Sequence, residues 1–294
     1  MSFTGGAPPS LSVVIPVRNG ATTLSQQLEA LAQAERPQGG FEVVVADNGS
    51  TDQSVVIALS FADRLNIRVI DASQRTGVNA ARNRGVLATS APWILFCDAD
   101  DEVDIAWLVA MYAAFRSGHG ILGGPIDYRI LNDGVTTAWR GATRATVKEM
   151  HGFLRAGHGA NMGVSRDVFD ALGGFDEGFV HGGDDTEFFW RAQLAGFDLL
   201  EVPNAIVHYR LRQTVAAHFR QFVHYGTAEV MLYQRFHQRG LHRRPVRALL
   251  RDLWWLATRA PFATNKARRG AWARRFATQY GRLIGSVRLR TLWW

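Results

Sequence analysis

Residues 93–101 read WILFCDADD, a short apolar run followed by three carboxylates. An uninterrupted apolar run of this length predicts a buried β-strand at 93–97. Three earlier runs have the same character, at 11–17 (LSVVIPV), 41–46 (FEVVVA) and 67–70. Segments with helical spacing of apolar or small residues separate the strands, notably 78–88. Strands that alternate with helices predict an α/β fold with a mostly parallel, doubly wound sheet flanked by helices.

Polar residues gather where the predicted strands end. Arg18 and Asn19 follow the first strand, residues 47–52 (DNGSTD) the second and residues 71–77 the third. In doubly wound sheets ligands bind beyond the carboxyl ends of the strands, so we expect the functional site there. Local structure offers a competing explanation, because Asp, Asn and Ser also form turns and helix caps. On those grounds, helix-capping boxes are predicted for Thr23 with Gln26 and for Ser50 with Gln53.

The carboxylates after Cys97 have the composition of a metal site. Asp98 and Asp100 lie one residue apart at the mouth of a predicted buried strand. Carboxylate oxygens suit hard cations, which predicts Mg²⁺ or Mn²⁺ held by these two residues together with substrate phosphate oxygens. Asp101 is predicted instead to cap a helix that starts near Asp104 and to be solvated.

Seven ordered motifs resemble the family 2 glycosyltransferases. They are SVVIPVRNG (12–20), VVVADNGSTD (43–52), RTGVNAARNRG (75–85), ILFCDADD (94–101), GANMGVSRDVFDALGGFDE (159–177), GGDDTEFFWRAQLAGF (182–197) and VPNAIVHYR (202–210). The resemblance covers about residues 10–212. It implies an A-type glycosyltransferase fold and inverting, metal-assisted transfer of a sugar from a nucleoside-diphosphate-sugar to a hydroxyl acceptor. Bacterial-type polysaccharide or lipid-linked glycan assembly is the implied setting.

The resemblance also implies roles for individual residues. Asp185 matches the catalytic base, and it opens a predicted helix whose N-terminal dipole favours an anion. The remaining matches are donor-binding Pro16, Arg18, Asp47, Arg75, Asn79 and Asp98; metal-binding Asp98, Asp100 and His208; and acceptor-binding His158, Asn161, Asp184 and Trp190.

Two of these residues have structural alternatives. Asp184 and Glu187 have the spacing of a capping box, so Asp184 is expected at least equally as a helix N-cap. His208 follows an apolar run, and a lone histidine in that position is more commonly a buried histidine than a ligand.

Charge divides the chain unevenly. Residues 1–213 hold 17 basic and 24 acidic side chains, whereas residues 214–294 hold 16 basic, 2 acidic and 13 aromatic ones. We therefore predict a nucleotide-sugar-binding and catalytic domain at 1–213 and a basic, aromatic-rich helical extension at 214–294. Arginine and tryptophan on amphipathic helices are typical of helices that bind an anionic membrane surface. A solvated helical subdomain coated by arginines, a helical cap over the active site and a homodimer interface are alternatives. Nucleic-acid binding is disfavoured because no recognised module accompanies the charge.

The amino-acid composition restricts the class of protein and its expected cellular location. Hydrophobic residues make up 47% and charged residues 20% of 294, which excludes a disordered or collagen-like chain. The single cysteine cannot form an intramolecular disulfide, and no apolar stretch approaches the length of a membrane span. We expect a cytoplasmic protein, peripheral on the inner face of the cell membrane if the extension binds lipid.

The sequence gives less support to other classes of function. A haloacid-dehalogenase-type phosphatase is disfavoured because Asp101 and Glu102 follow the Asp pair in place of Thr or Val. A nucleotidyltransferase needs a longer glycine- and basic-rich loop than Arg18-Asn19-Gly20 provides. A catalytically inactive nucleotide-sugar-binding or scaffold protein is the alternative from another class. The three carboxylates Asp98, Asp100 and Asp185 argue against that loss of activity.

Overall fold

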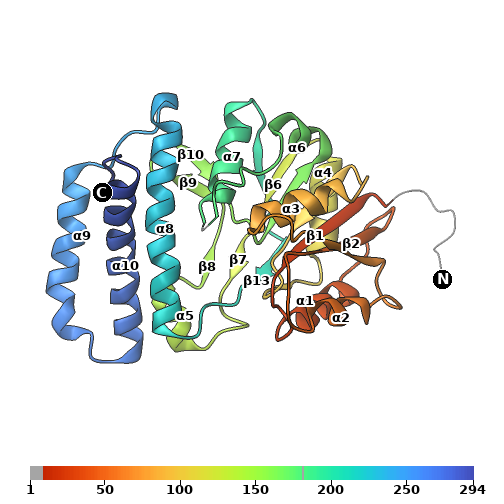
Figure 1. Cartoon of the computed structure of the whole chain (residues 1–294), viewed down its shortest axis with the longest axis horizontal. Coiled ribbons are helices and arrows are strands. Elements are labelled where there is room, and N and C mark those ends of the chain that lie inside the picture. The colour runs from red at the N-terminus through yellow and green to blue at the C-terminus, as the bar shows by residue number, and fades with distance from the viewer. Residues whose placement is uncertain (1–8, 181) are drawn as a thin grey trace.

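A seven-stranded sheet forms the centre of the molecule in the computed structural model, which describes residues 9–180 and 182–294 (Figure 1). Neighbouring strands are parallel except at β11, which runs antiparallel to both β4 and β6. The mostly parallel α/β prediction is therefore confirmed. In order across the sheet the strands are β12 (Leu199–Glu201), β6 (Ile121–Gly123), β11 (Met162–Ser165), β4 (Trp93–Phe96), β1 (Leu11–Val17), β2 (Phe41–Asp47) and β3 (Ile67–Asp71).

The strand order reverses direction beside β1, which pairs with β2 on one side and β4 on the other. Ligands of doubly wound sheets bind at such a switch point, outside the carboxyl ends of the strands. Here the ends that flank it lead into Arg18 and into Asp98. The predicted site therefore lies at the point that the topology favours.

Helices cover both faces of the sheet, as the alternating apolar pattern requires. One face packs against α1 (Leu24–Gln33), α2 (Ser54–Leu59) and α4 (Trp107–Arg116). The other packs against α3 (Val78–Leu87), α6 (Arg166–Leu172) and α7 (Asp184–Leu194). Fully buried Val13 and Val14 face opposite cores, because successive strand residues point to opposite sides.

Two small sheets and one short helix extend the carboxyl edge. The four-stranded sheet has the order β5 (Glu102–Val103), β13 (Val207–His208), β7 (Ile126–Asp127) and β8 (Arg144–Ala145). The two-stranded sheet pairs β9 (Lys148–Met150) with β10 (Leu154–Ala156), and α5 spans Gly134–Arg140. Within the described residues, no helix is long and apolar enough to cross a membrane.

Three long helices follow residue 214: α8 (Val215–Phe236), α9 (Val246–Arg259) and α10 (Lys266–Arg288). Figure 1 shows them side by side at the end of the molecule opposite the N-terminus. Glycines let α8 and α10 approach closely, because a Cβ on Gly226 would lie 2.2 Å from the Thr278 carbonyl oxygen and one on Gly281 would lie 2.1 Å from that of Val223. The α10 helix also packs on α5, since a Cβ on Gly270 would meet Trp139 at 2.3 Å.

The predicted capping boxes are wrong, because the loops use these side chains differently. Thr23 precedes α1 without a side-chain cap. Ser50 lies before the N-cap of α2, which is Gln53, and its hydroxyl accepts a hydrogen bond from the Asn19 amide at 3.0 Å. The loops after β1 and β2 are therefore tied to each other rather than to their own helices.

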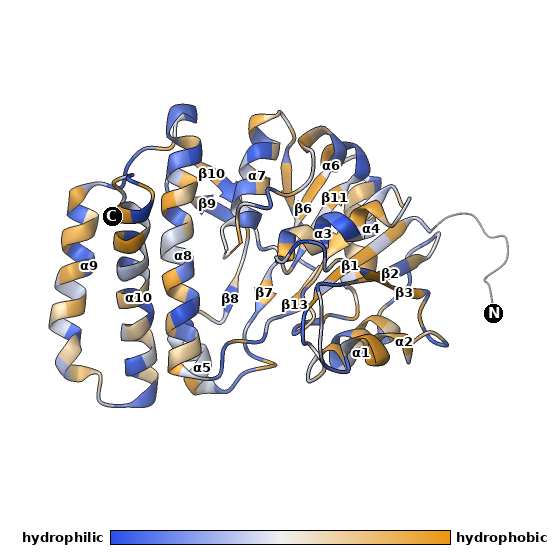
Figure 2. Ribbon diagram, viewed as in Figure 1, coloured by the Kyte–Doolittle hydropathy of each residue, from blue (hydrophilic) through white to orange (hydrophobic). Residues whose placement is uncertain are grey.

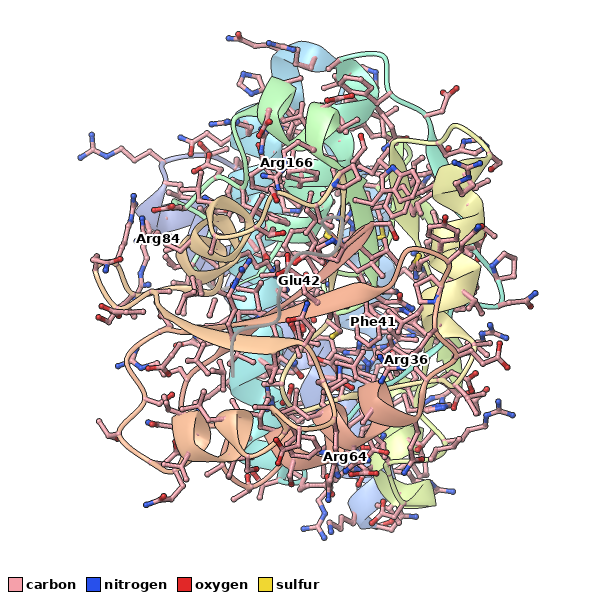
Figure 3. All side chains as sticks on the ribbon, turned by 90° about the vertical axis from the view of Figure 1, so that its right-hand side faces the viewer. Arg36, Phe41, Glu42, Arg64, Arg84 and Arg166 are labelled. Atoms are coloured by element: carbon pink, nitrogen blue, oxygen red, sulfur yellow. The ribbon has the colours of Figure 1, made fainter. Side chains whose placement is uncertain are left out.

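The edge of the molecule away from the C-terminal helices is held by ionic and polar contacts (Figure 3). Glu42 is buried on β2, where it pairs with Arg68 at 3.1 Å. Arg166 donates to the carbonyl oxygens of Val86, Thr89 and Ala91, which joins α6 to the chain that leads into β4. These contacts fix the strands whose other ends carry the candidate site.

Candidate active site

Three carboxylates converge after β4. Side-chain oxygens of Asp98, Asp100 and Asp101 all lie within 4.8 Å of one another. Asp101 was expected to be a solvated helix cap, and that expectation is wrong: its exposed fraction is 1%, and α4 begins at Trp107 with Ala106 as N-cap. One Asp101 oxygen accepts a hydrogen bond from the Arg210 backbone amide at 2.8 Å, and the other is buried without a partner.

Two arginines balance part of this charge. Arg82 lies 3.1 Å from Asp98, and Arg212 lies 3.0 Å from Asp100. Burial nevertheless raises the pKa of Asp98, although Arg82 opposes the shift. Burial raises the pKa of Asp101 further, and the neighbouring charges of Asp100 and Asp98 add to that rise. Three carboxylates therefore share two arginines, and burial disfavours the charged forms of Asp98 and Asp101.

Arg82 connects this cluster to a second group of acids. It comes from α3, its side chain is 4% exposed, and its other nitrogen lies 2.7 Å from Asp184. The capping role expected for Asp184 is wrong, because Gly183 is the N-cap of α7 with φ of 76°. Burial raises the pKa of Asp184 to about 6 against the opposing effect of Arg82. Arg82 was not singled out from the sequence, although it lies within the family motif at 75–85 and the predicted helix at 78–88.

Asp185 lies in the first turn of α7, as predicted. Its carboxylate accepts hydrogen bonds from the Gly159 amide at 3.0 Å and from the Thr186 amide at 2.7 Å. His158 is an electrostatic neighbour of Asp185, but burial lowers the pKa of its imidazole to about 4, so it is neutral at pH 7. The backbone therefore orients the carboxylate, and a neutral imidazole lies beside it.

A cavity of about 900 Å³ joins these groups. Asp98, Asp184, Asp185 and His158 line it, together with Arg82 and Arg212. Residues of α8 and α10 supply the opposite wall, among them Phe222, Tyr225 and Arg274. The C-terminal helices therefore contribute directly to the space in front of Asp185.

His208 does not join the carboxylate cluster. Its Nε2 lies 3.5 Å from the Asp104 carboxylate, and β13 pairs it with Asp127 of β7 and Glu102 of β5. Asp101, rather than His208, is the third residue beside Asp98 and Asp100. The metal set predicted from the sequence is therefore not assembled as expected.

Three predicted binding residues are buried inside the fold, which contradicts direct substrate contact. Asn161 is fully buried; its side chain accepts from Trp107 and donates to the carbonyl oxygens of Pro125 and Ala205. Trp190 is fully buried and donates to the Leu154 carbonyl oxygen. Asn79 is 2% exposed and donates to the carbonyl oxygens of Asp176 and Phe179. These side chains hold loops that border the site.

The other donor-side residues lie at the carboxyl edge outside the cavity lining. Arg18 is exposed, Pro16 pairs with Ala46 within the sheet, and Asp47 accepts a hydrogen bond from the Ser50 amide at 3.1 Å. Arg75 is exposed and pairs with Glu177 at 2.8 Å. The side chain of Asn48 joins the two loops in this region, since it donates to the carbonyl oxygens of Ala72 and Arg75 and accepts from the Gly77 amide.

A mostly parallel sheet with a carboxylate cluster after a central strand, beside a cavity, is the arrangement of the A-type glycosyltransferase fold. Solved structures share this fold across nearly the whole chain. A mannosyltransferase from Pyrobaculum calidifontis, PcManGT, in complex with GDP-Man and Mn²⁺, has a TM-score of 0.64 at 18% identity and covers 95% of this chain and 87% of that one. TarS 1–349 from S. aureus with UDP-GlcNAc has a TM-score of 0.54 at 16% identity, covering 96% of this chain and 92% of that one.

The chain belongs to glycosyl transferase family 2. The family model matches residues 12–173, more than half of the 294 residues, and a second model, glycosyl transferase family group 2, matches residues 93–280. The resemblance of the ordered motifs to this family is thereby confirmed.

Curated relatives are glycosyltransferases as well. Glycosyltransferase AglE of Haloferax volcanii is 29% identical over 194 residues, which is 65% of this chain and 64% of that protein. A PGL/p-HBAD biosynthesis glycosyltransferase of Mycobacterium tuberculosis is 40% identical over 116 residues, which is 38% of this chain and 44% of that protein. The matched regions therefore span about half to two thirds of those relatives' own lengths.

Proposed function

We propose that this glycosyltransferase moves a sugar from a nucleoside-diphosphate-sugar to a hydroxyl acceptor with inversion, using Asp185 as the base. The observation that carries the proposal is that Asp185 and Asp98 line one cavity and are linked through Arg82 and Asp184. A leaving group that departs at one end and a base at the other suit a single displacement, which inverts the anomeric centre. Residues 1–213 would supply these groups, and 214–294 would close the acceptor side.

The base has one task in this scheme. An acceptor hydroxyl is a poor nucleophile, and a carboxylate within hydrogen-bond reach removes its proton as the new bond forms. The Gly159 and Thr186 amides hold the Asp185 carboxylate in place. His158, neutral beside it, is proposed to contact the acceptor, whereas buried Asp184 is proposed to act by positioning Arg82.

The carboxylate cluster fits a divalent cation. Asp98, Asp100 and Asp101 offer oxygens that converge, and Asp101 keeps a buried oxygen without a partner. Oxygen ligands of this kind suit Mg²⁺ or Mn²⁺. PcManGT and GalNAc-T7, which share the fold, are Mn²⁺ complexes, the latter with a TM-score of 0.55 over 76% of this chain. When bound here, the cation would offset negative charge on the departing diphosphate.

A calorimetric panel tests the donor half of the proposal. UDP, GDP, dTDP and CMP are titrated into the protein, each with Mn²⁺ and with EDTA. We expect one nucleoside diphosphate to bind in the micromolar range only with metal, and Asp100→Ala to weaken that binding. Asp63→Ala, at an exposed acid remote from the cluster, is the matched control. Equal affinity with Mn²⁺ and with EDTA contradicts the metal assignment.

We also propose that α9 and α10 bind an anionic membrane, so that the acceptor side of the cavity lies next to the lipid surface. Apolar side chains are exposed along both helices, including Trp254 (66%), Leu283 (61%) and Val287 (72%). Figure 2 shows apolar residues mixed with polar ones over α9. The two acids beyond residue 213, Glu229 and Asp252, both pair with arginines that are not exposed. Within the described residues, no carboxylate lies within 4.0 Å of the exposed arginines on α9 and α10. A lipid-linked acceptor is the substrate class that such a surface favours.

Liposome co-sedimentation tests the membrane proposal. We expect binding to vesicles with anionic headgroups in low salt, little binding to zwitterionic ones, and loss of binding in Leu253→Glu with Trp254→Glu. Leu87→Glu replaces a leucine on α3 that is more exposed than Leu253, and this variant should bind as the unmodified protein does. No sedimentation with anionic vesicles in low salt rejects the proposal.

A further inference from the structure

Two arginines at the acceptor end of the cavity share one aromatic ring. The guanidinium carbons of Arg140 and Arg274 lie 5.2 and 5.7 Å from the ring centroid of Phe222. Arg140 comes from α5, Arg274 from α10 and Phe222 from α8, and all three line the cavity. Two cations are therefore held side by side in a partly enclosed space by three separate helices.

Neither guanidinium has an acidic partner. In residues 9–180 and 182–294, no carboxylate oxygen is paired with Arg140 or Arg274 within 4.0 Å. Arg140 donates to the Tyr128 hydroxyl at 3.0 Å, and Arg274 donates to the Trp139 carbonyl oxygen at 2.9 Å. By contrast, the cavity arginines Arg82, Arg212 and Arg282 each pair with at least one carboxylate.

The pKa values of Arg274 and His218 are lowered at this place, whereas the pKa of Arg140 is raised, because the tyrosines around it outweigh its burial. Burial, together with the charges of Arg140 and Arg275, lowers the pKa of Arg274 to about 10. The His218 ring lies tilted by 56° against Phe222, with the two centroids 4.8 Å apart. His218 is fully buried and has no hydrogen-bond partner at either ring nitrogen. Burial and the two arginines lower the pKa of His218 to about 4. Cations withdrawn from water without a counter-ion destabilise a fold unless a ligand supplies one.

We propose that Arg140 and Arg274 bind an anionic group, a phosphate or a carboxylate, carried by the acceptor. The planar N–H groups of guanidinium match both kinds of anion. This inference rests on the proposed function, because it places the acceptor hydroxyl at Asp185. His158 and Tyr225 are electrostatic neighbours of both Asp185 and Arg140, and these four residues line one cavity together with Arg274. The donor diphosphate belongs at Asp98 and Asp100, where Arg212 is already paired.

The test uses full-length protein saturated with its nucleoside diphosphate and Mg²⁺, so that the donor site is occupied. Thermal unfolding is followed as inorganic phosphate, glycerol 3-phosphate or glucuronate is added. We expect at least one of the three to raise Tm saturably, and the phosphate and carboxylate arms identify the class of anion. Arg274→Gln should weaken this binding about tenfold or more, while Arg275→Gln, which removes the adjacent charge stacked on Trp255 outside the cavity lining, should not.

Stability without anion separates binding from a structural role. Removal of one of two uncompensated like charges should leave the Tm of Arg274→Gln at or above that of the unmodified protein, whereas a structural arginine would lower it. Arg274→Lys should keep part of the anion response, and Arg140→Gln is the second variant if Arg274→Gln fails to fold. No stabilisation by any anion, or an equal response in Arg274→Gln, overturns the proposal. Loss of nucleoside diphosphate binding in Arg274→Gln instead assigns the pair to the donor and also overturns it.

Discussion

The two ends of the cavity differ in whether their arginines are paired with carboxylates. At the sheet end, Asp98, Asp100 and Asp184 each face an arginine. At the end formed by α5, α8 and α10, Arg140 and Arg274 have aromatic and backbone partners only. The first arrangement holds side chains to which we assign roles in the proposed reaction. The second leaves two cations without an acidic partner, and in our proposal the acceptor supplies that partner.

The largest expected effect concerns the base between these ends. Asp185→Asn should lower turnover by about 10²–10⁴-fold and leave nucleoside diphosphate affinity unchanged, because an amide cannot accept the hydroxyl proton. Steady-state kinetics and calorimetry measure the two quantities. Asp167→Asn, at an exposed acid in the first turn of α6, should change neither. Loss of donor affinity in Asp185→Asn would place this carboxylate at the sheet end instead.

Substitution of Arg82 tests how much its ion pairs with Asp98 and Asp184 contribute to stability. Arg82→Met leaves Asp98 and Asp184 without their buried cation, which should lower the free energy of unfolding by about 3–5 kcal/mol. Urea denaturation of both proteins measures the difference. Arg84 lies two residues further along the same helix, is exposed, and is labelled in Figure 3, so Arg84→Met serves as the matched control with an expected change near zero. A similar small loss in both variants would show that the ion pairs are replaceable by solvent.

A smaller effect on stability, dependent on pH, is expected from His218, which lies near Arg140 and Arg274. Its pKa in the folded state, about 4, lies below the ordinary value of 6.5, so the unfolded chain binds the proton more readily. Stability from this group is therefore complete above pH 6.5 and is lost as pH falls towards 4. Between pH 7 and pH 5 the loss is about 2 kcal/mol.

His218→Phe should remove that part of the pH dependence, because phenylalanine keeps the aromatic packing against Phe222 and Trp139 and does not titrate. Denaturant unfolding at pH 5 and pH 7 checks it. His242→Phe, at an exposed position, should leave the pH dependence as it is. An unchanged pH dependence in His218→Phe would mean that other groups balance the two arginines.

Much of the fold was predictable because local patterns specify it. The apolar runs located β1 at its observed bounds and placed β2, β3 and β4 within one residue at their carboxyl ends. Asp98, Asp100, Asp185 and His158 were all predicted for the site, and all but Asp100 line the cavity while Asp100 adjoins Asp98. The roles of these residues in the reaction stay proposals, as does the division of the chain at residue 213.

The predictions for individual side chains that the structure does not support share one cause. Asn79, Asn161 and Trp190 belong to the right motifs, but whether a polar or aromatic side chain points into a cavity or into the core depends on which distant segment packs over it. Trp107 and Ala205, for instance, enclose Asn161 from far along the chain. The same limit hid Arg82, whose partners lie 16 and 102 positions away.

The sequence alone determined the alternation of strands and helices, the order of the family motifs and the excess of positive charge after residue 213, because each depends on neighbouring residues or on composition. Tertiary structure alone decided which arginines meet a carboxylate and which do not. Arg140, Arg212 and Arg274 look alike in sequence, and only the packing of α5 and α10 around Phe222 sets two of them apart from Arg212, which reaches Asp100. The reason is physical: a charge is balanced by what lies within a few ångströms in space, and chain position does not encode that distance.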